Sequence, residues 1–246
     1  MRKILTYILA LSCVLGLTAC TNSTKPEPQN EIQSQSDTSR NTLVVYFSMP
    51  ETTDSKNMTE EEDNSTVVID GEVMGNTQYV AMEIQEKMNA DIFRIEPETA
   101  YTTNHEELVD IASKEQEENA RPEIKDKISD FEQYDTIFVG YPIWWSDLPM
   151  IMYSFFDEYD FSDKTIIPFS THGGSGLADT ISTIQELEPN ANVYEQGLSI
   201  SRNDIENSSE EISQWLEKVS KGVHYEKKSF SFIGKSPKKW KFRYVM

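Results

Sequence analysis

The stretch Leu43–Phe47 (LVVYF) is an unbroken apolar run that includes two adjacent valines. Such a run is typical of a central strand in a parallel sheet, because that strand is buried on both of its faces. Comparable runs follow at 91–95 (DIFRI), 136–140 (TIFVG) and 165–169 (TIIPF), and residues 192–200 are polar enough for an edge strand. Stretches with apolar residues at helical spacing separate these runs. The alternation predicts an α/β fold, a doubly wound five-stranded parallel sheet with helices on both faces.

The helices between the strands are predicted from apolar residues that recur every three or four positions. In the first helix these residues are Val80, Ile84 and Met88. The last helix is predicted to begin at the capping-box pattern Ser208-x-x-Glu211. The predicted helices span residues 75–88, 104–119, 124–131, 148–156, 177–184 and 208–219.

The first residues of the chain have the pattern of an export signal. A basic start, Met1-Arg2-Lys3, precedes a mostly apolar run at 4–17, which is too short to span a bilayer permanently. The run ends in Leu17-Thr18-Ala19-Cys20, which resembles the lipobox of bacterial lipoprotein signals. The resemblance implies that residues 1–19 are a signal peptide and that Cys20 carries lipid at the outer face of the bacterial cell membrane. The alternative is an ordinary cleaved signal with an unrelated cysteine nearby.

The remaining residues divide into three segments. Residues 20–41 are rich in Ser, Asn, Gln and Pro, and they predict a flexible tether. The folded domain is expected at 42–220. Residues 221–246 contain eight basic residues and one acid, with aromatic residues between them. This tail is expected either to be disordered or to lie on anionic lipid headgroups.

The chain as a whole is strongly acidic. It has 22 Lys and Arg against 42 Asp and Glu, which gives a formal net charge of −20 at pH 7. An acidic surface repels phosphate backbones, so nucleic acid is not expected as a partner of the folded domain. The histidines are scattered without the spacing of metal ligands, and they predict no metal site.

The functional site is expected in the loops that follow Phe47, Gly140 and Phe169. In a doubly wound sheet the ligand lies at the carboxyl ends of the strands, and these loops share that edge. Their sequences are unusual for connections of this kind. The residues concerned are Ser48 with Gly75-Asn76-Thr77, then Tyr141-Pro142-Ile143-Trp144-Trp145, and then Thr171-His172-Gly173-Gly174-Ser175-Gly176.

These sequences resemble the cofactor loops of the flavodoxin-like family. The strand end at 45–48, taken with Gly75-Asn76-Thr77, resembles the flavodoxin phosphate loop between the first strand and the first helix. The other two sequences resemble the flavin-contacting loops of a flavodoxin-like family that is widespread in bacteria. The resemblance covers about residues 42–219. It implies the strand order 2-1-3-4-5, FMN as the cofactor, and contacts to FMN from all the loop residues quoted above.

One departure from the family pattern lies in residues 49–74, which interrupt the phosphate loop between Ser48 and Gly75. The insert contains the pattern of a hairpin, with Thr66–Ile69 as one strand, a turn at Asp70-Gly71, and Glu72-Val73 in the other. A hairpin would bring the two halves of the loop together. Without it, the phosphate site would be incomplete.

The residue types in these loops suit FMN. Backbone N–H groups at a helix N-terminus, together with the hydroxyls of Ser48 and Thr77, bind phosphate without a cation. Trp144 and Trp145 cannot both point inward from a short connection, so at least one is expected beside the cleft as a stacking surface. Tyr141 is a further stacking candidate. The alternative is that both tryptophans pack under the neighbouring helix.

The sequence Thr171–Gly176 also has a competing interpretation. A His-Gly-Gly run occurs in the oxyanion strip of lipase-like hydrolases, but the Gly-x-Ser-x-Gly pentapeptide that such enzymes need is absent from the sequence. We therefore favour the flavin loop. His172 is expected either to donate a hydrogen bond to reduced flavin or to stabilise its own turn.

The sequence thus predicts an exported, lipid-anchored FMN protein that transfers electrons at the membrane surface. Its expected partner is an unidentified redox protein or a quinone. The cofactor supplies the chemistry in such a protein, so no catalytic residue is predicted. Two alternatives on the same fold stay open: an FMN-dependent NAD(P)H:quinone reductase, and a binding lipoprotein that has lost the flavin.

Overall fold

A central parallel sheet organises the part of the chain that the structure describes. This computed structural model describes residues 41–233, with side chains as far as residue 222. The strands of the sheet are β1 (Thr42–Phe47), β4 (Asp91–Ile95), β5 (Thr136–Pro142), β6 (Thr165–His172), β7 (Asn192–Val193) and β8 (Leu198–Ser201). The strand order is β4-β1-β5-β6-β7, β8 also pairs with β6, and every pairing is parallel. The predicted doubly wound order 2-1-3-4-5 is confirmed.

The fifth predicted strand is divided in two. β7 and β8 pair with opposite ends of β6, and residues 194–197 leave the ladder between them. Ile166 O accepts a hydrogen bond from Tyr194 N (2.8 Å), so the backbone of Ile166 faces the side of β6 on which β7 and β8 lie. Alternate residues of a strand bond to the same neighbour, and the backbone of Pro168 therefore faces that side as well. Proline has no N–H to donate, which explains why the ladder is interrupted opposite this residue.

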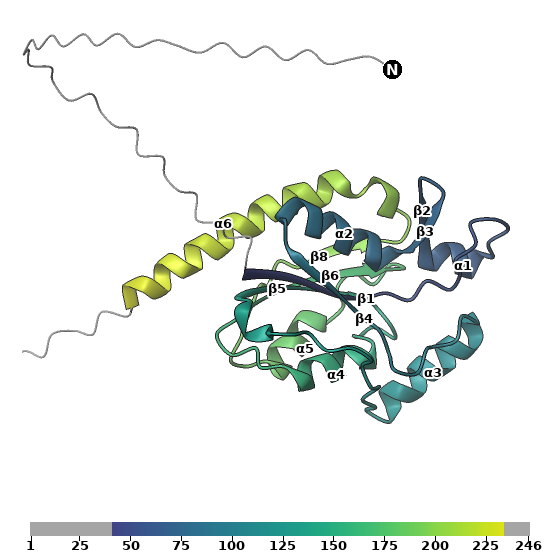
Figure 1. Cartoon of the computed structure of the whole chain (residues 1–246), viewed down its shortest axis with the longest axis horizontal. Helices are drawn as coiled ribbons and strands as arrows, with labels where there is room; N and C mark the ends of the chain where they lie inside the picture. Colours follow the sequence, from purple (N-terminus) through teal and green to yellow (C-terminus); the bar gives the residue numbers. More distant parts are fainter. Residues whose placement is uncertain (1–40, 234–246) are drawn as a thin grey trace, which may run out of the picture. The chain divides into compact units, whose positions relative to one another are not determined.

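Helices cover both faces of the sheet (Figure 1). α2 (Asn76–Met88) and α6 (Ser209–Ile233) lie on one face, and α4 (Met150–Glu158) and α5 (Thr180–Leu187) lie on the other. The alternating residues of β1 supply a core on each side: Val44 belongs to the cluster that contains Ile84 of α2, and Val45 to the cluster that contains Met152 of α4. Every residue of β1 is buried, which accounts for its apolar sequence.

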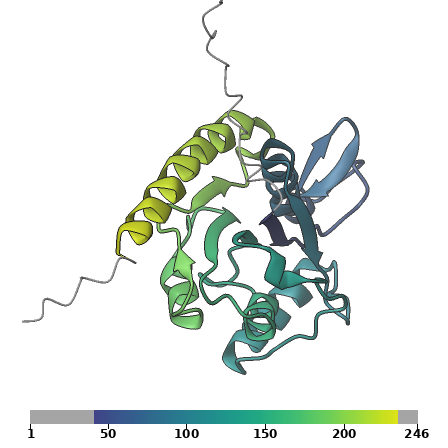
Figure 2. The same cartoon turned by 60° about the vertical axis from the view of Figure 1, so that its left-hand side comes forward.

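The insert at 49–74 forms a short helix and a hairpin beside α2 (Figure 2). Its elements are α1 (Glu60–Ser65), β2 (Thr66–Ile69) and β3 (Glu72–Gly75). The predicted hairpin is confirmed, because β2 and β3 are antiparallel and Asp70 and Gly71 form the turn with φ of 51° and 86°. Positive φ at both turn residues matches the twist of the flanking strands, and an Asp-Gly pair tolerates it.

One predicted helix is absent. Residues 124–131 run as an irregular segment in which Ile124 forms an isolated antiparallel bridge with Pro97, and a 3-10 turn at Phe131–Gln133 follows. Ile124 and Ile128 still pack against the core. Their helix-like spacing therefore reflects side chains that are partly buried although the backbone is irregular. The predicted helix at 104–119, in contrast, does form as α3 (His105–Glu117).

The last helix also differs from the prediction at both ends. Ser208 does not cap it: the Ser208 hydroxyl donates to Ile205 O (2.7 Å), because a 3-10 turn at Ile205–Asn207 leads directly into α6. At the other end α6 continues to Ile233, so the first part of the segment predicted as a tail is helical. Among residues 41–233, no helix has both the length and the apolar sequence needed to cross a membrane.

Several predictions concern residues outside the described range. These are the signal peptide at 1–19, the lipid on Cys20, the tether as far as residue 40, and residues 234–246 of the basic tail.

Glu188, which follows α5, makes stability depend on pH. Burial, and then the carboxylates of Asp160 and Asp157, raise the pKa of Glu188 from 4.5 to about 7. A carboxyl group with a raised pKa binds its proton more tightly in the folded state, so its contribution to stability is present below about pH 4.5 and is lost as the pH rises through about 7. We expect Glu188→Gln to raise the free energy of unfolding at pH 8 by about 1 kcal/mol, after allowance for solvent screening, and to change it little at pH 4.

Urea denaturation at the two pH values measures this effect. Glu186→Gln is the matched control, because Glu186 lies two residues earlier, in the last turn of α5, and is exposed. A gain that is equal at both pH values, or equal for both variants, would contradict the expected coupling to the carboxylates.

Candidate functional site

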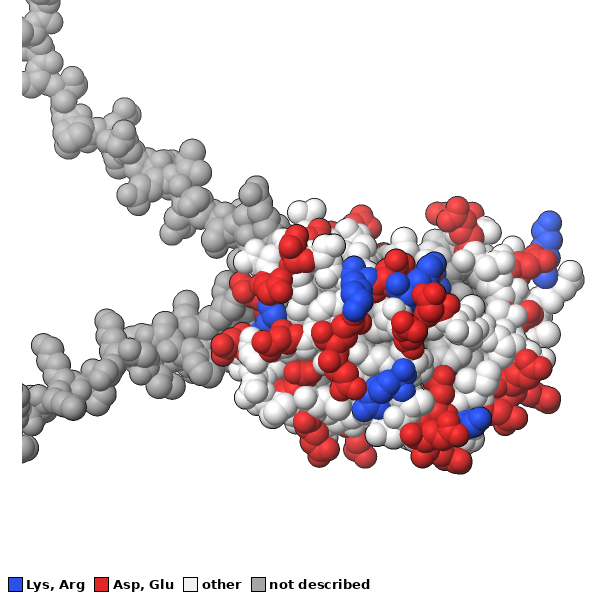
Figure 3. Space-filling model, turned by 60° about the horizontal axis from the view of Figure 1, so that its bottom comes forward, with Lys and Arg blue, Asp and Glu red and all other residues white. Residues whose placement is uncertain are grey.

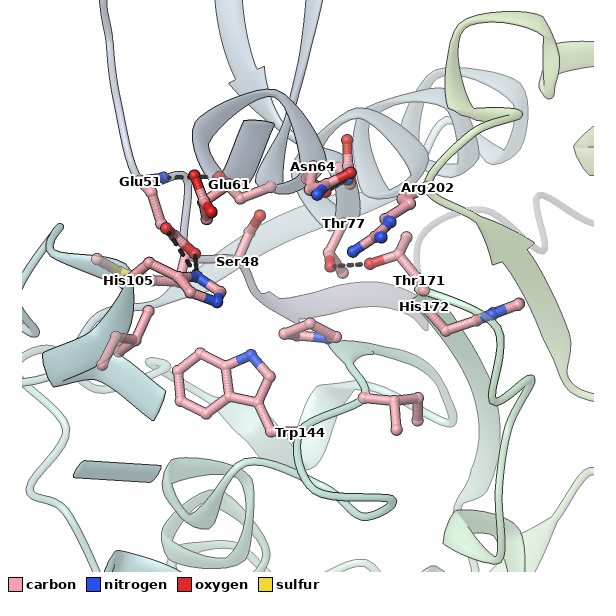
Figure 4. A pocket seen from close by; sticks show the side chains of 17 residues that line it. Ser48, Glu51, Glu61, Asn64, Thr77, His105, Trp144, Thr171, His172 and Arg202 are labelled. Carbon is pink, nitrogen blue, oxygen red and sulfur yellow. Dashed lines mark hydrogen bonds and ion pairs between the residues drawn. The ribbon is translucent and has the colours of Figure 1, made fainter. Parts of the chain in front are cut away.

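A cavity lies at the carboxyl ends of β1, β5, β6 and β8, and Figure 4 shows the side chains around it. We call it the main cleft, and its volume is about 200 Å³. The predicted site residues that line it are Ser48, Asn76, Thr77, Pro142, Ile143, Trp144, Thr171, His172 and Gly173. Further lining residues, which the sequence did not single out, are Met49, Glu51, Glu61, Asn64, Ser65, His105, Leu108 and Arg202.

The two halves of the interrupted loop meet at Ser48. The Ser48 hydroxyl accepts a hydrogen bond from Gln78 N (3.3 Å), and Gly75 N donates to Gln78 Oε1 (3.4 Å). A Cβ at Gly75 would lie 2.2 Å from Ser48 Oγ and 3.2 Å from Pro50 Cδ, so only glycine permits this approach. The hairpin of the insert thereby returns the chain to the end of β1.

The N-terminus of α2 faces the main cleft. Asn76 and Thr77 are the first residues of the helix, and N–H groups at this position have no acceptor within the helix. The hydroxyls of Thr77 and Thr171 are joined by a hydrogen bond of 2.7 Å, which links the first loop to the third. Asn76 Nδ2 donates to Asn64 O (2.9 Å), but the buried Asn76 Oδ1 has no partner among the described residues. This oxygen lacks a hydrogen-bond donor.

The second loop is a tight turn that separates the two tryptophans. Trp144 N donates to Asp147 O (3.0 Å) and Asp147 N donates to Trp144 O (2.9 Å), so Trp145 and Ser146 occupy the turn with φ of 48° and 64°. The Asp147 carboxylate stabilises the turn, because it accepts hydrogen bonds from Leu148 N (2.8 Å) and from the Tyr153 hydroxyl (2.7 Å).

The tryptophans are therefore in different environments. Trp144 is half-buried, and its ring packs edge to face with Phe47 (centroids 5.4 Å apart) and with Tyr101 (5.6 Å). Trp145 is 55% exposed, and its Nε1 donates to Val109 O of α3 (3.2 Å). Trp144 lines the main cleft, whereas Trp145 lines only a neighbouring cavity of about 290 Å³, which we call the second cavity.

His172 stabilises the third loop. Its Nδ1 accepts a hydrogen bond from Gly174 N (2.9 Å), which is one of the two predicted roles of this residue. Burial lowers the pKa of His172, and Asp204 opposes this only in part, so the ring is favoured in its neutral form. With Nδ1 acting as the acceptor, the ring proton lies on Nε2.

The insert and α3 add a hydrogen-bonded pair of side chains, a carboxylate and an imidazole, to the site. Glu51 is 8% exposed, and its two carboxylate oxygens lie 3.0 and 3.1 Å from His105 Nδ1. No sequence signal identified this pair, because the path of an insert is not fixed by the sheet. Arg202 was also missed, although it directly follows β8 and the rule that ligands lie at the carboxyl ends of strands would have found it.

Comparison with known proteins places this arrangement in a family. A family model described as Flavodoxin matches residues 66–219, more than half of the chain. The chain belongs to the flavodoxin family. Two solved structures agree with the fold. A "putative flavoprotein" from Bacteroides uniformis ATCC 8492 has TM-score 0.54 and 27% identity, over 72% of this chain and 97% of that chain. Another from Bacteroides eggerthii DSM 20697 has TM-score 0.55 and 24% identity, over 73% and 97%. A search of curated proteins found no match.

Within this flavodoxin fold, the prediction that Tyr141 stacks on a ligand is wrong. Its side chain is fully buried and its hydroxyl forms a hydrogen bond with Thr180 Oγ1 (2.9 Å). β5 continues as far as Pro142, so Tyr141 still follows the strand alternation and joins Ile137 and Val139 in the core on the α4 side. Five other predicted residues, Gly75, Trp145, Gly174, Ser175 and Gly176, do not line the main cleft.

We expect Tyr141→Phe to act on stability alone. The substitution removes one buried hydrogen bond, while Thr180 Oγ1 keeps its bond to Leu177 O (2.6 Å). The free energy of unfolding should fall by about 1 kcal/mol, measured by urea denaturation, and ligand binding in the main cleft should not change. Tyr79→Phe is the control, because no hydrogen bond of the Tyr79 hydroxyl occurs within residues 41–233. Weaker ligand binding in Tyr141→Phe would show that the ring reaches the cleft after all.

Proposed function

We propose that this chain binds FMN in the main cleft and functions as an electron-transfer flavoprotein. One observation carries the proposal: a helix N-terminus, a group of hydroxyls and an indole ring converge on one cavity at the carboxyl edge of the sheet. A phosphorylated planar cofactor needs these partners. Membership of the flavodoxin family supports the same conclusion, because the resemblance of the three loops implies FMN.

The polar groups of the cleft fit the phosphate and sugar part of FMN. The N-terminus of α2 offers N–H groups and a positive dipole end, and Thr77 and Thr171 add hydroxyls. Asn76 Oδ1 is buried and lacks a donor, which a hydroxyl of the FMN ribityl chain would provide. A buried acceptor without a partner costs stability, so its presence in the cleft favours a ligand with hydroxyl groups.

The electrostatics require such local donors. Acidic side chains outnumber basic ones, which gives the chain a formal net charge of −20. Figure 3 shows acidic side chains spread over one face of the described surface. A phosphate therefore binds only where local dipoles and cations outweigh the field of the whole protein. Arg202 is the guanidinium that lines the main cleft, and it lies against Gly173, where an added Cβ would be 3.2 Å from Arg202 Nη1.

The apolar wall of the cleft fits the flavin ring. Trp144, Ile143 and Pro142 form one side of it, and Trp144 lies opposite Ser48 and Thr77 in the view of Figure 4. Bound FMN would supply the redox chemistry, and the chain's part is to hold the ring, exclude water from one face and leave an edge open for electron exchange.

The membrane location is a further part of the proposal. The lipobox resemblance at Leu17–Cys20 supports a lipid anchor on Cys20 at the outer face of the cell membrane. The acidic folded domain would be repelled by anionic headgroups, so a tether of the length of residues 21–41 suits a domain that exchanges electrons with a partner near the surface.

FMN binding is tested by titrating FMN into the purified full-length protein and following the quenching of flavin fluorescence. We expect saturable binding with one FMN per chain. Gly75→Ala and Thr77→Val should each weaken the affinity at least tenfold, about 1.4 kcal/mol, because the first separates the halves of the loop and the second removes a hydroxyl from the phosphate site. Thr183→Val, on α5, is the control for a threonine outside the cleft.

Absence of binding to the unmodified chain would refute the proposal and favour a flavin-free binding lipoprotein. Equal affinity in Gly75→Ala, Thr77→Val and Thr183→Val would also refute it, because FMN would then bind elsewhere. Circular dichroism of each variant separates loss of the site from loss of the fold.

A charge variant tests the position of the phosphate. Glu61 lines the main cleft from α1 and is exposed, so its negative charge opposes a phosphate there. We expect Glu61→Gln to tighten FMN binding about threefold at low ionic strength and to have less effect at 0.5 M salt. The control Glu60→Gln changes an exposed residue that does not line the cleft. Equal effects of the two variants would mean that the phosphate is not near Glu61.

A further inference from the structure

His105 lies on the side of the main cleft that carries the apolar wall. It lines both the main cleft and the second cavity, as Trp144 does. Figure 4 shows the imidazole on the same side of the cleft as Trp144, and Thr77 and Arg202 lie farther to the right in that view. His105 is therefore at the end of the cleft that fits the flavin ring, and the groups that fit the phosphate are at the other end.

A buried carboxylate fixes the orientation of this imidazole. Glu51 is 8% exposed, and its two carboxylate oxygens lie 3.0 and 3.1 Å from His105 Nδ1. A carboxylate only accepts hydrogen bonds, so Nδ1 carries a proton and donates to Glu51. Nε2 is therefore the nitrogen that gains or loses a proton, and a carboxylate on Nδ1 stabilises the protonated ring. The His105 side chain is 48% exposed, so water can supply that proton.

The stability of α3 does not explain a histidine at this position. His105 is the first residue of the helix, where a positive charge is unfavourable because the helix dipole has its positive end there. The helix is already capped by Asn104, whose side chain accepts a hydrogen bond from Glu107 N (3.1 Å). The pairing of His105 with a buried carboxylate therefore points to a role in the cavities that both side chains line.

His105 differs from the second histidine of the main cleft. The Nδ1 atom of His172 accepts a hydrogen bond from Gly174 N, and burial lowers the pKa of His172, so its ring stays neutral. His105 faces a carboxylate instead of a backbone N–H. Of the two histidines whose side chains the structure describes, His105 is thus the one that can become positively charged near neutral pH.

We propose that His105 takes up a proton when FMN in the main cleft is reduced, and that the resulting imidazolium balances the charge that the ring gains. This inference rests on the proposed binding of FMN in the main cleft. It adds a means by which pH regulates the reduction potential of that site.

The step balances in electrons and protons. A flavin ring that accepts two electrons and one proton carries one more negative charge than the oxidised ring. His105 Nε2 takes a second proton from water, so that two electrons and two protons enter the site and its net charge is unchanged. The electrons come from a redox partner protein, or from dithionite in the experiment below. Glu51 is a positioning residue, since it acts through His105.

The charges around His105 favour this compensation. The charged side chains that line the cleft with it are Glu51, Glu61 and Arg202, and the first turn of α3 adds Glu106 and Glu107. The four acidic groups favour the protonated form of His105 and oppose a further negative charge on the ring. Arg202 lies at the phosphate end of the cleft. Among the side chains that line the cleft, His105 is therefore the cation that can form beside the ring.

The direction of the pH effect follows from this charge balance. Reduced FMN places a negative charge beside His105, so the imidazolium is stabilised more in the reduced state than in the oxidised state. The chain therefore binds reduced FMN more tightly, relative to oxidised FMN, when His105 is protonated. This preference is present at low pH and is lost as the pH rises through the range in which an imidazole releases its proton.

The experiment compares the midpoint potential of FMN bound to the full-length protein with that of free FMN. The difference gives the ratio of the affinities of the chain for reduced and oxidised FMN. Dithionite is added slowly in the presence of a reference dye, at pH 6 and at pH 9. His105→Gln is the test variant, because a glutamine amide can still donate to Glu51 but does not titrate. We expect the affinity ratio of the unmodified chain to exceed that of His105→Gln about tenfold at pH 6 and to equal it at pH 9.

Two further variants are the controls. His105→Lys carries a positive charge at both pH values, so its affinity ratio should stay above that of His105→Gln at pH 6 and at pH 9. Glu60→Gln removes an exposed carboxylate that does not line the main cleft, and it should keep the pH dependence of the unmodified chain.

The outcomes separate this inference from the proposed function. A His105→Gln variant that differs from the unmodified chain by the same factor at both pH values, or not at all, overturns the proton uptake, because the Glu51–His105 pair would then be structural only. A His105→Lys variant that behaves like His105→Gln overturns the charge compensation. Both results leave FMN binding intact, whereas a chain that binds no FMN overturns the proposed function and this inference with it.

Discussion

The contact between Gly75 and Ser48 is the constraint on which the site depends. These residues belong to opposite ends of an insert, and their approach restores a loop that the sequence interrupts. The approach requires that Gly75 lack a Cβ and that the hairpin turn at Asp70-Gly71 reverse the chain without strain. Once the halves meet, α2 begins at the end of β1, and its N-terminus faces the strand edge.

The insert also contributes to the site that it could have disrupted. Glu51, Glu61 and Asn64 line the main cleft, although none of them belongs to the three loops that carry the family resemblance. Glu51 and His105 join the insert to α3 through a hydrogen bond, and both residues line both cavities. An insertion in a cofactor loop therefore changes which side chains surround the ligand without changing the sheet that positions them.

The tryptophan turn explains why adjacent aromatic residues have different roles. Reversal of the chain between Trp144 and Asp147 places the first indole against the core and the second at the surface. The turn needs positive φ at Trp145 and Ser146, neither of which favours it. The hydrogen bonds of the Asp147 carboxylate and the bond from Trp145 to α3 hold this conformation, so the acidic residue beside the tryptophans has a structural role.

The sequence by itself determined the sheet and the edge at which the site lies, because buried parallel strands have apolar runs and loops at their carboxyl ends share one edge. The strand order followed from the resemblance of the three loops to those of flavodoxins. It also determined the hairpin, through a local Asp-Gly turn. Tertiary structure alone decided that Tyr141 faces the core, that 124–131 is not helical and that Glu51 meets His105. Each of these depends on contacts between residues distant in the chain, and local spacing carries no information about them.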